Sequence, residues 1–150
     1  MNQPMNPVPE ISMDGFQLVS SEMFREPSRR YDATCTIWHD SIAFSKVSVT
    51  SLNGCERVLL KVNPEDKRIL IIPCTIKDKD AIRWTKYVKE PVPRKMDCRS
   101  FASRLYQMWN WKKDFVYRTS GRLVTSDKKV MLLFDFSSPE SWQFKAKEAQ

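Results

Sequence analysis

Two short apolar runs separated by a five-residue polar loop constrain the fold of this chain more than any other feature. The runs, residues 58–62 and 68–72, have the length and composition of β-strands. Residues 63–67 between them include Pro64, which presets a turn. The pattern therefore predicts a β-hairpin. Pro73 is expected to end its second strand, because proline has no backbone donor for a ladder.

A second hairpin is predicted closer to the C-terminus. Residues 115–118 have a strand pattern, the Ser-Gly pair at 120–121 is typical of a turn or bulge, and residues 123–124 continue the strand briefly. A polar turn at 126–129 then leads into the apolar run 130–136.

Each hairpin is preceded by a predicted helix. In the second half, apolar residues lie at i, i+4, i+7 and i+8 along one helical face: Phe101, Leu105, Met108 and Trp109. Asp97 or Ser100 is available as its N-cap. In the first half, a short helix over 45–52 is expected to end at Asn53-Gly54, although its β-branched residues and serines disfavour a helix in isolation.

The remaining segments are less strongly patterned. Residues 34–44 read as two strand pieces around a turn at 39–41. Residues 1–12 are expected to form a flexible tail, 16–19 to begin a short strand, and 25–30 to form a basic loop. The polar stretch after the first hairpin is interpreted as a connector that holds one short strand around 82–88.

The chain length of 150 residues, with 41% hydrophobic and 29% charged residues, favours one solvated domain, which we place at residues 13–150. The order of elements predicts an α+β fold. No apolar run approaches the roughly 20 residues of a membrane helix, so we expect a cytoplasmic protein without membrane association. The four cysteines have no paired spacing and are expected to be free thiols.

The two halves share the order helix, strand, turn, strand, which indicates two pseudo-repeats at about 34–74 and 95–136. Placing Leu52 over Met108 aligns the helices with an offset of 56 positions. The offset grows to about 61 at the last strands because the loops of the second half are longer.

Residues 42–73 resemble the swapped-hairpin DNA-binding module of the AbrB, SpoVT and MraZ family. The family pattern is a strand, Ile-Pro-Lys, a helix ending in Leu-Gly, then two strands around a turn, the second ending in Pro. This chain has Phe44-Ser45-Lys46 in place of Ile-Pro-Lys, and Asn53 inserted before its glycine. The second half resembles the module more loosely, with a Trp-Asn-Trp run at 109–111 replacing Leu-Gly, so the double copy is similar to MraZ.

The resemblance implies a small β-barrel-like domain built from two interlocked strand-helix-hairpin repeats. It also implies that basic residues around the first loop and the helix of each copy face DNA. The matching positions are Arg29, Arg30, Lys46 and Arg57 in the first half, and Arg94, Lys95, Arg99 and Arg104 in the second.

The positive charge is concentrated in one segment. Residues 77–129 carry 15 Lys and Arg against 6 Asp and Glu, or +9, whereas the rest carries 10 against 12, or −2, which gives the total of +7. Such a segment favours a polyanionic partner, since neutralised phosphates release counterions. A solvated basic face that only maintains solubility is the alternative interpretation.

Catalysis has little support in the sequence. The single histidine, His39, lies in a predicted turn, and the three glycines are not clustered, so no phosphate-binding loop can be built. We expect no enzyme activity, no metal site and no cofactor. Aromatic residues alternate with basic ones at 83–87, 109–113 and 117–118, a pattern that fits either base stacking or core packing.

Two functional hypotheses follow. The first is a nucleic-acid-binding protein, specifically a DNA-binding transcriptional regulator of the AbrB or MraZ type. The second is a non-catalytic protein-interaction or accessory module of a mobile element, which uses exposed aromatics or an unpaired strand edge. Association into a homo-oligomer is left open by both hypotheses.

Overall fold

The computed structural model describes residues 8–21, 32–86, 89 and 92–144. In chain order the elements are β1 (Thr34–Trp38), β2 (Ser41–Phe44), α2 (Lys46–Ser51), β3 (Arg57–Asn63), β4 (Arg68–Cys74), β5 (Ile82–Arg83), β6 (Met96–Asp97), α3 (Arg99–Met108), β7 (Phe115–Ser126), β8 (Lys129–Asp135) and β9 (Glu140–Gln143). No helix in these described ranges has the length and apolar character needed to cross a membrane.

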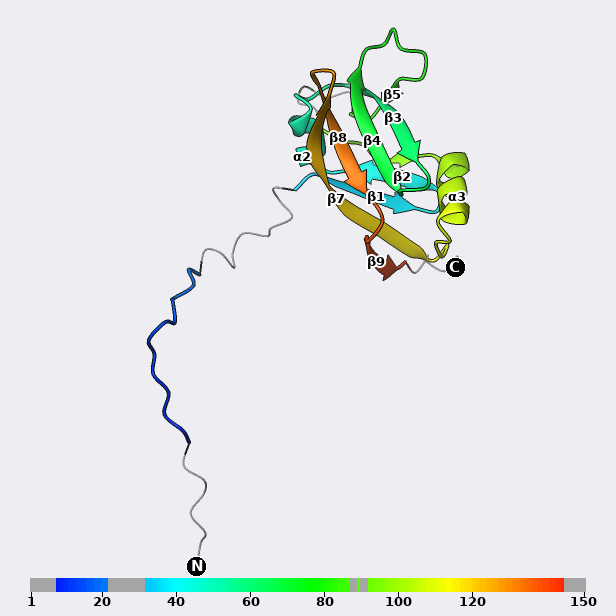
Figure 1. The fold of residues 1–150 in the computed structure, drawn as a ribbon. Coiled ribbons are helices and arrows are strands. Elements are labelled where there is room, and N and C mark those ends of the chain that lie inside the picture. The colour runs from blue at the N-terminus through cyan, green and yellow to red at the C-terminus, as the bar shows by residue number, and fades with distance from the viewer. Residues whose placement is uncertain (1–7, 22–31, 87–88, 90–91, 145–150) are drawn as a thin grey trace, which may run out of the picture.

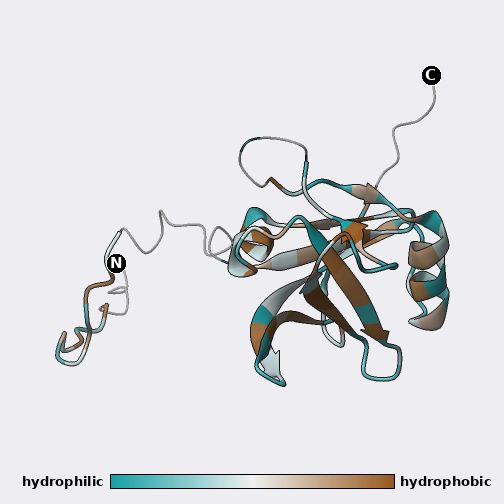
Figure 2. Cartoon of the chain, turned by 90° about the horizontal axis from the view of Figure 1, so that it is seen from above, coloured by the Kyte–Doolittle hydropathy of each residue, from teal (hydrophilic) through white to brown (hydrophobic). Residues whose placement is uncertain are grey.

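The strands form one antiparallel sheet that curls into a half-barrel, and α2 and α3 lie at opposite ends of it (Figures 1 and 2). The strand order is β5-β3-β4-β8-β7-β1-β2-β6, with β9 paired to β7. Residues 85 and 93 add an isolated antiparallel bridge beyond β5 and β6. The predicted α+β class is therefore confirmed, with sheet as the larger part.

The first predicted hairpin is confirmed as β3 and β4, whose register runs from Arg57 opposite Cys74 to Asn63 opposite Arg68. Pro73 does not end the second strand, however, because it lies inside β4 opposite Val58. Backbone groups of alternate residues point to opposite neighbours. The missing N–H of Pro73 falls on the β8 side, beyond the last pair of that ladder at Ile71, where no strand partner requires it.

The second hairpin is also present, but its first strand is longer than predicted. The predicted turn at 120–121 is wrong, because β7 continues through both residues as a 12-residue strand. Gly121 pairs with Phe134 of β8, and a Cβ placed on it would lie 2.6 Å from the Phe134 ring. Glycine is therefore used here for the close approach of a ring to the backbone, and the chain does not turn at this point.

The short first-half helix forms despite its poor intrinsic propensity. Ser45 is the N-cap, and its Oγ accepts a hydrogen bond from the Ser48 N–H at 3.3 Å. The buried Ser48 hydroxyl donates to the Thr34 carbonyl at 3.1 Å, which fastens α2 to β1. As predicted, the helix is followed by left-handed residues, with φ of 58° at Asn53 and 68° at Gly54.

The apolar face of α3 packs on the sheet. Leu105 and Trp109 are buried, whereas Met108 is half exposed. The Trp109 Nε1–H donates to the Pro64 carbonyl at 3.0 Å, at the tip of the β3–β4 hairpin. The hairpin of the first half is thus bound to the helix of the second half.

Aromatic residues from distant parts of the chain meet in the core. Phe44 lies 5.4 Å from Trp84 and 5.6 Å from Phe134, measured between ring centroids. The Trp84 indole N–H donates to the Cys55 carbonyl at 2.6 Å, so its burial leaves no polar atom unsatisfied. Figure 2 shows hydrophobic stretches on the strands and hydrophilic turns around them. The four cysteines are free thiols, as predicted.

Two further predictions need correction. Residues 16–19 form no strand, and their large side chains are exposed to solvent. The N-cap of α3 is Cys98, which makes no side-chain capping bond, rather than Asp97 or Ser100. The predicted basic loop at 25–30 lies outside the described residues.

Candidate nucleic-acid interface

The structure distributes the predicted interface residues over both ends of the half-barrel. Lys46 begins α2, and Arg57 begins β3. Arg94 and Lys95 immediately precede β6, Arg99 begins α3, and Arg104 lies midway along α3. Arg29 and Arg30 lie outside the described residues. Because α2 and α3 occupy opposite ends, Lys46 does not share a face with the basic residues of α3 (Figure 1).

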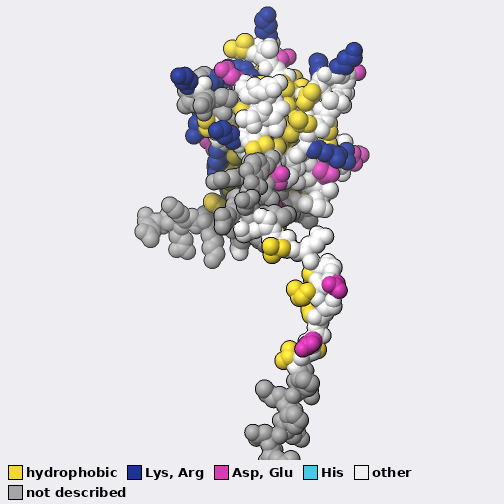
Figure 3. All heavy atoms as spheres, turned by 90° about the vertical axis from the view of Figure 1, so that its left-hand side faces the viewer, with side chains coloured by type: hydrophobic (Ala, Val, Ile, Leu, Met, Phe, Trp, Pro, Cys, Tyr) yellow, Lys and Arg dark blue, Asp and Glu magenta, His cyan; other side chains and the backbone are white. Residues whose placement is uncertain are grey.

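The end that carries α2 has a mixed surface. Figure 3 views the molecule from this side and shows Lys and Arg side chains mainly along its edges, several of them close together on the left flank, with acidic and hydrophobic side chains among them. Lys46 is exposed at the start of α2, at the end of the half-barrel opposite α3.

A first basic group forms where β3 meets β5. Arg57 lies directly opposite Arg83 in this ladder. The Arg94 Nε–H donates to the Arg83 carbonyl at 3.0 Å, which draws a third arginine to the same place. Arg83 itself lies 3.6 Å from the Glu56 carboxylate, so one of the three positive charges is partly neutralised. This group joins one first-half residue of the prediction, Arg57, to one second-half residue, Arg94.

A second basic group lies between the β1–β2 turn and the start of α3. The Lys95 Nζ lies 4.0 Å from the centroid of the Trp38 ring, a cation–π contact. The turn is held against the helix because the Cys98 N–H donates to the Asp40 carbonyl at 2.9 Å. Arg99 follows on the first turn of α3 and is exposed.

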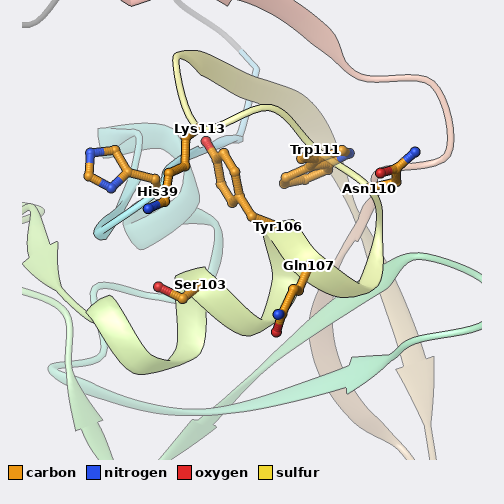
Figure 4. A pocket seen from close by; sticks show the side chains of 7 residues that line it. All are labelled: His39, Ser103, Tyr106, Gln107, Asn110, Trp111 and Lys113. Atoms are coloured by element: carbon orange, nitrogen blue, oxygen red, sulfur yellow. The ribbon is translucent and has the colours of Figure 1, made fainter.

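Next to this group is a cleft of about 460 Å³, which we call the polar cleft. Its lining residues come from the β1–β2 turn, from α3 and from the loop before β7: His39, Ser103, Tyr106, Gln107, Asn110, Trp111 and Lys113. Figure 4 shows these side chains arranged around Tyr106. Hydroxyl, amide, imidazole and ammonium groups all donate hydrogen bonds, so the polar cleft suits an acceptor-rich or anionic ligand.

Tyr106 is a structural part of the polar cleft. Its hydroxyl lies 3.0 Å from the Ile37 carbonyl and 2.6 Å from the Phe115 carbonyl, and it serves as donor to this pair. Burial raises the pKa of this phenol well above its usual value, so it stays protonated. The tyrosine thus fixes the floor of the cleft rather than supplying a reactive group.

The sequence pattern of aromatic residues fitted either base stacking or core packing, and the structure shows which of these residues are buried. Trp84 and Trp109 are core residues, with 0% and 4% exposure, and are not accessible to stack on bases. Trp111 is half-buried and stacks on Tyr117, with ring centroids 4.0 Å apart. The aromatic nearest the second basic group is Trp38, which sequence reasoning missed, because only the folded register brings it to Lys95.

The four second-half residues of the predicted interface are not paired with described carboxylates. The ion pairs among the described Lys, Arg, Asp and Glu residues are Arg68 with Asp135, Arg83 with Glu56, and Arg118 with Glu140, and His39 lies 3.9 Å from the Asp40 carboxylate. None of them includes Arg94, Lys95, Arg99 or Arg104.

Comparison of the chain with known family models, curated proteins and solved structures finds no match in any of the three.

Proposed function

We propose that this chain is a cytoplasmic nucleic-acid-binding protein, a DNA-binding regulator that uses the β6–α3 end of the half-barrel. The observation that carries the proposal is the set of exposed cations at 94, 95, 99 and 104, none in an ion pair with a described carboxylate. Cations left free in this way are available for phosphate, and each phosphate that they neutralise adds affinity through counterion release.

The polar cleft would extend this surface. Lys113 and His39 line it together with hydroxyl and amide groups, all of which donate to phosphate or sugar oxygens. Lys95 contacts Trp38, the last residue of β1, and His39 of the cleft follows it in the β1–β2 turn. We infer that the cations bind phosphates and that the cleft receives a sugar or base edge.

The proposal includes the two-repeat architecture. The sequence placed the second copy at about 95–136, and we extend it back to β5, so that the proposed copies are β1-β2-α2-β3-β4 and β5-β6-α3-β7-β8. A twofold relation requires matching elements to pair with one another, and β2 with β6 and β4 with β8 are both antiparallel pairs. The pairing of β1 with β7 has a counterpart in β5 with β3. The β1–β2 ladder is matched only by the isolated bridge of residues 85 and 93, since β5 and β6 form no ladder with each other. Ile71 lies opposite Leu132, at the offset of 61 given by the sequence alignment.

The hairpin contacts support the swapped arrangement. The tip of β3–β4 meets the second helix through the bond between Trp109 and Pro64. At the other end, Val130 of the β7–β8 hairpin borders an open cleft of about 420 Å³ together with Leu52 and Asn53, which follow α2. The first hairpin thus bonds to the residue that ends the helix of the other copy, and the second lies across a cleft from the residues after α2, an arrangement that supports the AbrB-like relation.

The test is a binding titration with duplex and single-stranded DNA of random sequence at two salt concentrations. Replacing Arg94, Lys95, Arg99 and Arg104 by Ala should weaken binding by at least about tenfold at low salt. The same replacement should reduce the slope of log K against log salt by about 0.9 for each phosphate that the variant no longer neutralises.

The matched control removes four charges elsewhere, as K77A, K79A, K128N and K129A. Asn is chosen at 128 because Lys128 has a φ of 66°, a conformation that Asn tolerates. The control should retain most of the affinity and slope. If both variants lost the same affinity, the loss would be due to net charge and not to the β6–α3 surface. If the variant with Ala at 94, 95, 99 and 104 bound DNA as tightly as the wild type, the β6–α3 surface would be removed from the proposal.

A further inference from the structure

The half-barrel has a gap along β3. Between β3 on one side and β6 with α3 on the other lies a cleft of about 440 Å³, which we call the edge cleft. Its walls are mainly apolar and include Leu60 and Val62 of β3, Met96 of β6 and Phe101 of α3. Arg94 stands at the same cleft and is exposed. An apolar cleft that opens beside a strand favours an extended peptide more than a rigid polar ligand.

The edge of β3 that borders this cleft is unpaired in the described residues. On this side β3 pairs with β5 only at Arg57 and Val58. The Trp84 N–H donates to the Glu56 carbonyl, so residue 56 directs its backbone groups towards β5. Because these directions alternate along a strand, Leu60 and Val62 direct theirs to the same side, past the end of β5. Two residues thus present a free donor and acceptor row to the edge cleft.

The N-terminal segment of the same chain has the complementary features. Large apolar side chains there are exposed, with Phe16 at 69% and Leu18 at 100%. These two residues are separated by one position, so in an extended strand they point to the same face. Residues 8–21 contain Glu10 and Asp14 and no basic residue, which complements the arginine at the cleft. Such exposed apolar residues mark an interaction site rather than an inert tail.

We infer that residues 16–19 add as a strand to the free edge of β3, with Phe16 and Leu18 inserted into the edge cleft. Backbone bonds to Leu60 and Val62 supply the register, and the two side chains supply the apolar contact. Asp14, two residues before the inserted pair, is then placed for attraction by Arg94. The inference is argued separately from the proposed nucleic-acid function, since neither Leu60 nor Val62 belongs to that interface. The two proposals share Arg94, for which Asp14 and phosphate would compete.

The occupant is the segment of the same chain. Twelve residues separate Val19 from Asp32, and at about 3.3–3.6 Å per residue they span up to about 45 Å. A domain of this size has a diameter of about 35 Å, so a path over its surface to the opposite pole is about 55 Å, and a span of about 45 Å reaches most of the surface but not that pole. Because the segment and the cleft belong to one chain, the chain's own segment is favoured over that of a second copy.

Amide hydrogen exchange of the full chain, followed by NMR, tests the inference. In the wild-type protein the amides of Leu60 and Val62 should exchange at least about tenfold more slowly than in the F16S/L18S variant. The amides of Leu59 and Lys61 point to β4 and should be protected equally in both, which verifies that the sheet is intact. The substituted side chains are exposed, so the variant should fold normally.

A second variant, I11S/M13S, changes exposed apolar residues outside the inserted stretch and should exchange like the wild type. Slow exchange that persists on dilution supports pairing within one chain. Equal rates in wild type and F16S/L18S would overturn the inference. Protection that disappears on dilution would assign the edge cleft to a second copy of the chain and would also overturn the inference. The inference would likewise be overturned if amide exchange at Leu60 and Val62 were as fast in I11S/M13S as in F16S/L18S.

Discussion

Replacement of Gly121 by Ala should destabilise the protein, although alanine is normally the better residue in a strand. The new Cβ would lie 2.6 Å from Cε1 and 2.8 Å from Cδ1 of Phe134. That ring is fully buried and packs against Phe44, so it has little room to move. Overpacking of this kind costs about 1–3 kcal/mol, and the entropic advantage of alanine returns about 0.5–1 kcal/mol. The difference is about 0–2.5 kcal/mol, and because the contact of 2.6 Å is with a ring that has little room to move, we expect a net loss in the upper part of this range, about 1–2 kcal/mol.

Thermal and urea unfolding of the variant would measure this loss. A change of about 1–2 kcal/mol corresponds to a decrease in Tm of roughly 3–8 °C for a chain of this size. The S120A variant, changed at the exposed neighbour of Gly121 in the same strand, should differ from wild type by no more than about 0.5 kcal/mol.

A double-mutant cycle tests the cause. F134L removes the ring that the new methyl group meets, so G121A should cost little or nothing in that background. The expected coupling between the two sites is about 1 kcal/mol or more. If G121A were neutral or stabilising alone, or if the two effects were simply additive, the steric explanation would be refuted.

Two further predictions concern buried polar groups. Y106F should lower the free energy of unfolding by about 1–3 kcal/mol in urea titrations, because the two backbone carbonyls that share the single O–H proton of Tyr106 lose this donor; an unchanged midpoint would show that water replaces the hydroxyl. Burial raises the pKa of Cys55 and Cys98 to about 11 from 9.0, so at pH 8 both should react with a thiol reagent about a hundredfold more slowly than an unfolded thiol. The unfolded state therefore loses these protons first, and stability should fall as pH rises from about 9 to 11, less steeply in the C55A/C98A variant. Equal slopes in the two proteins would contradict this assignment.

The sequence pattern was sufficient to predict α3 and the β3–β4 hairpin, because these elements are determined by residues close to one another in the sequence. The face of α3 follows from the spacing of its apolar residues, and Leu105 and Trp109 are buried accordingly. The β3–β4 hairpin follows from two apolar runs and a turn containing Pro64. In both cases the contacts that decide the structure lie within a few residues of one another.

Tertiary contacts decided the cases that the sequence did not predict. Pro73 is accepted inside β4 because the neighbouring ladder ends at Ile71, and this end is set by β8, more than 50 residues later. Gly121 reads as a turn residue in isolation, yet its lack of a side chain serves Phe134 on the adjacent strand. Neither partner can be inferred from the local pattern alone.

The candidate interface stays a prediction. Arg94, Lys95, Arg99 and Arg104 were chosen by matching positions to a family pattern, and the structure places them in or next to β6 and α3. The same pattern also selected Lys46, which the topology places at the end of the half-barrel opposite α3. The polar cleft was missed because its residues come from three separate segments, and each segment alone looks like an ordinary surface turn or helix.

The bond from Trp109 to Pro64 joins parts of the molecule 45 positions apart in sequence. A cut in the loop that follows β4 would therefore yield two fragments whose apolar surfaces are completed only by each other. We expect neither fragment to fold alone. When both are expressed together, the folded domain should form only where the two fragments associate, so that they could serve as the two halves of a split-protein system.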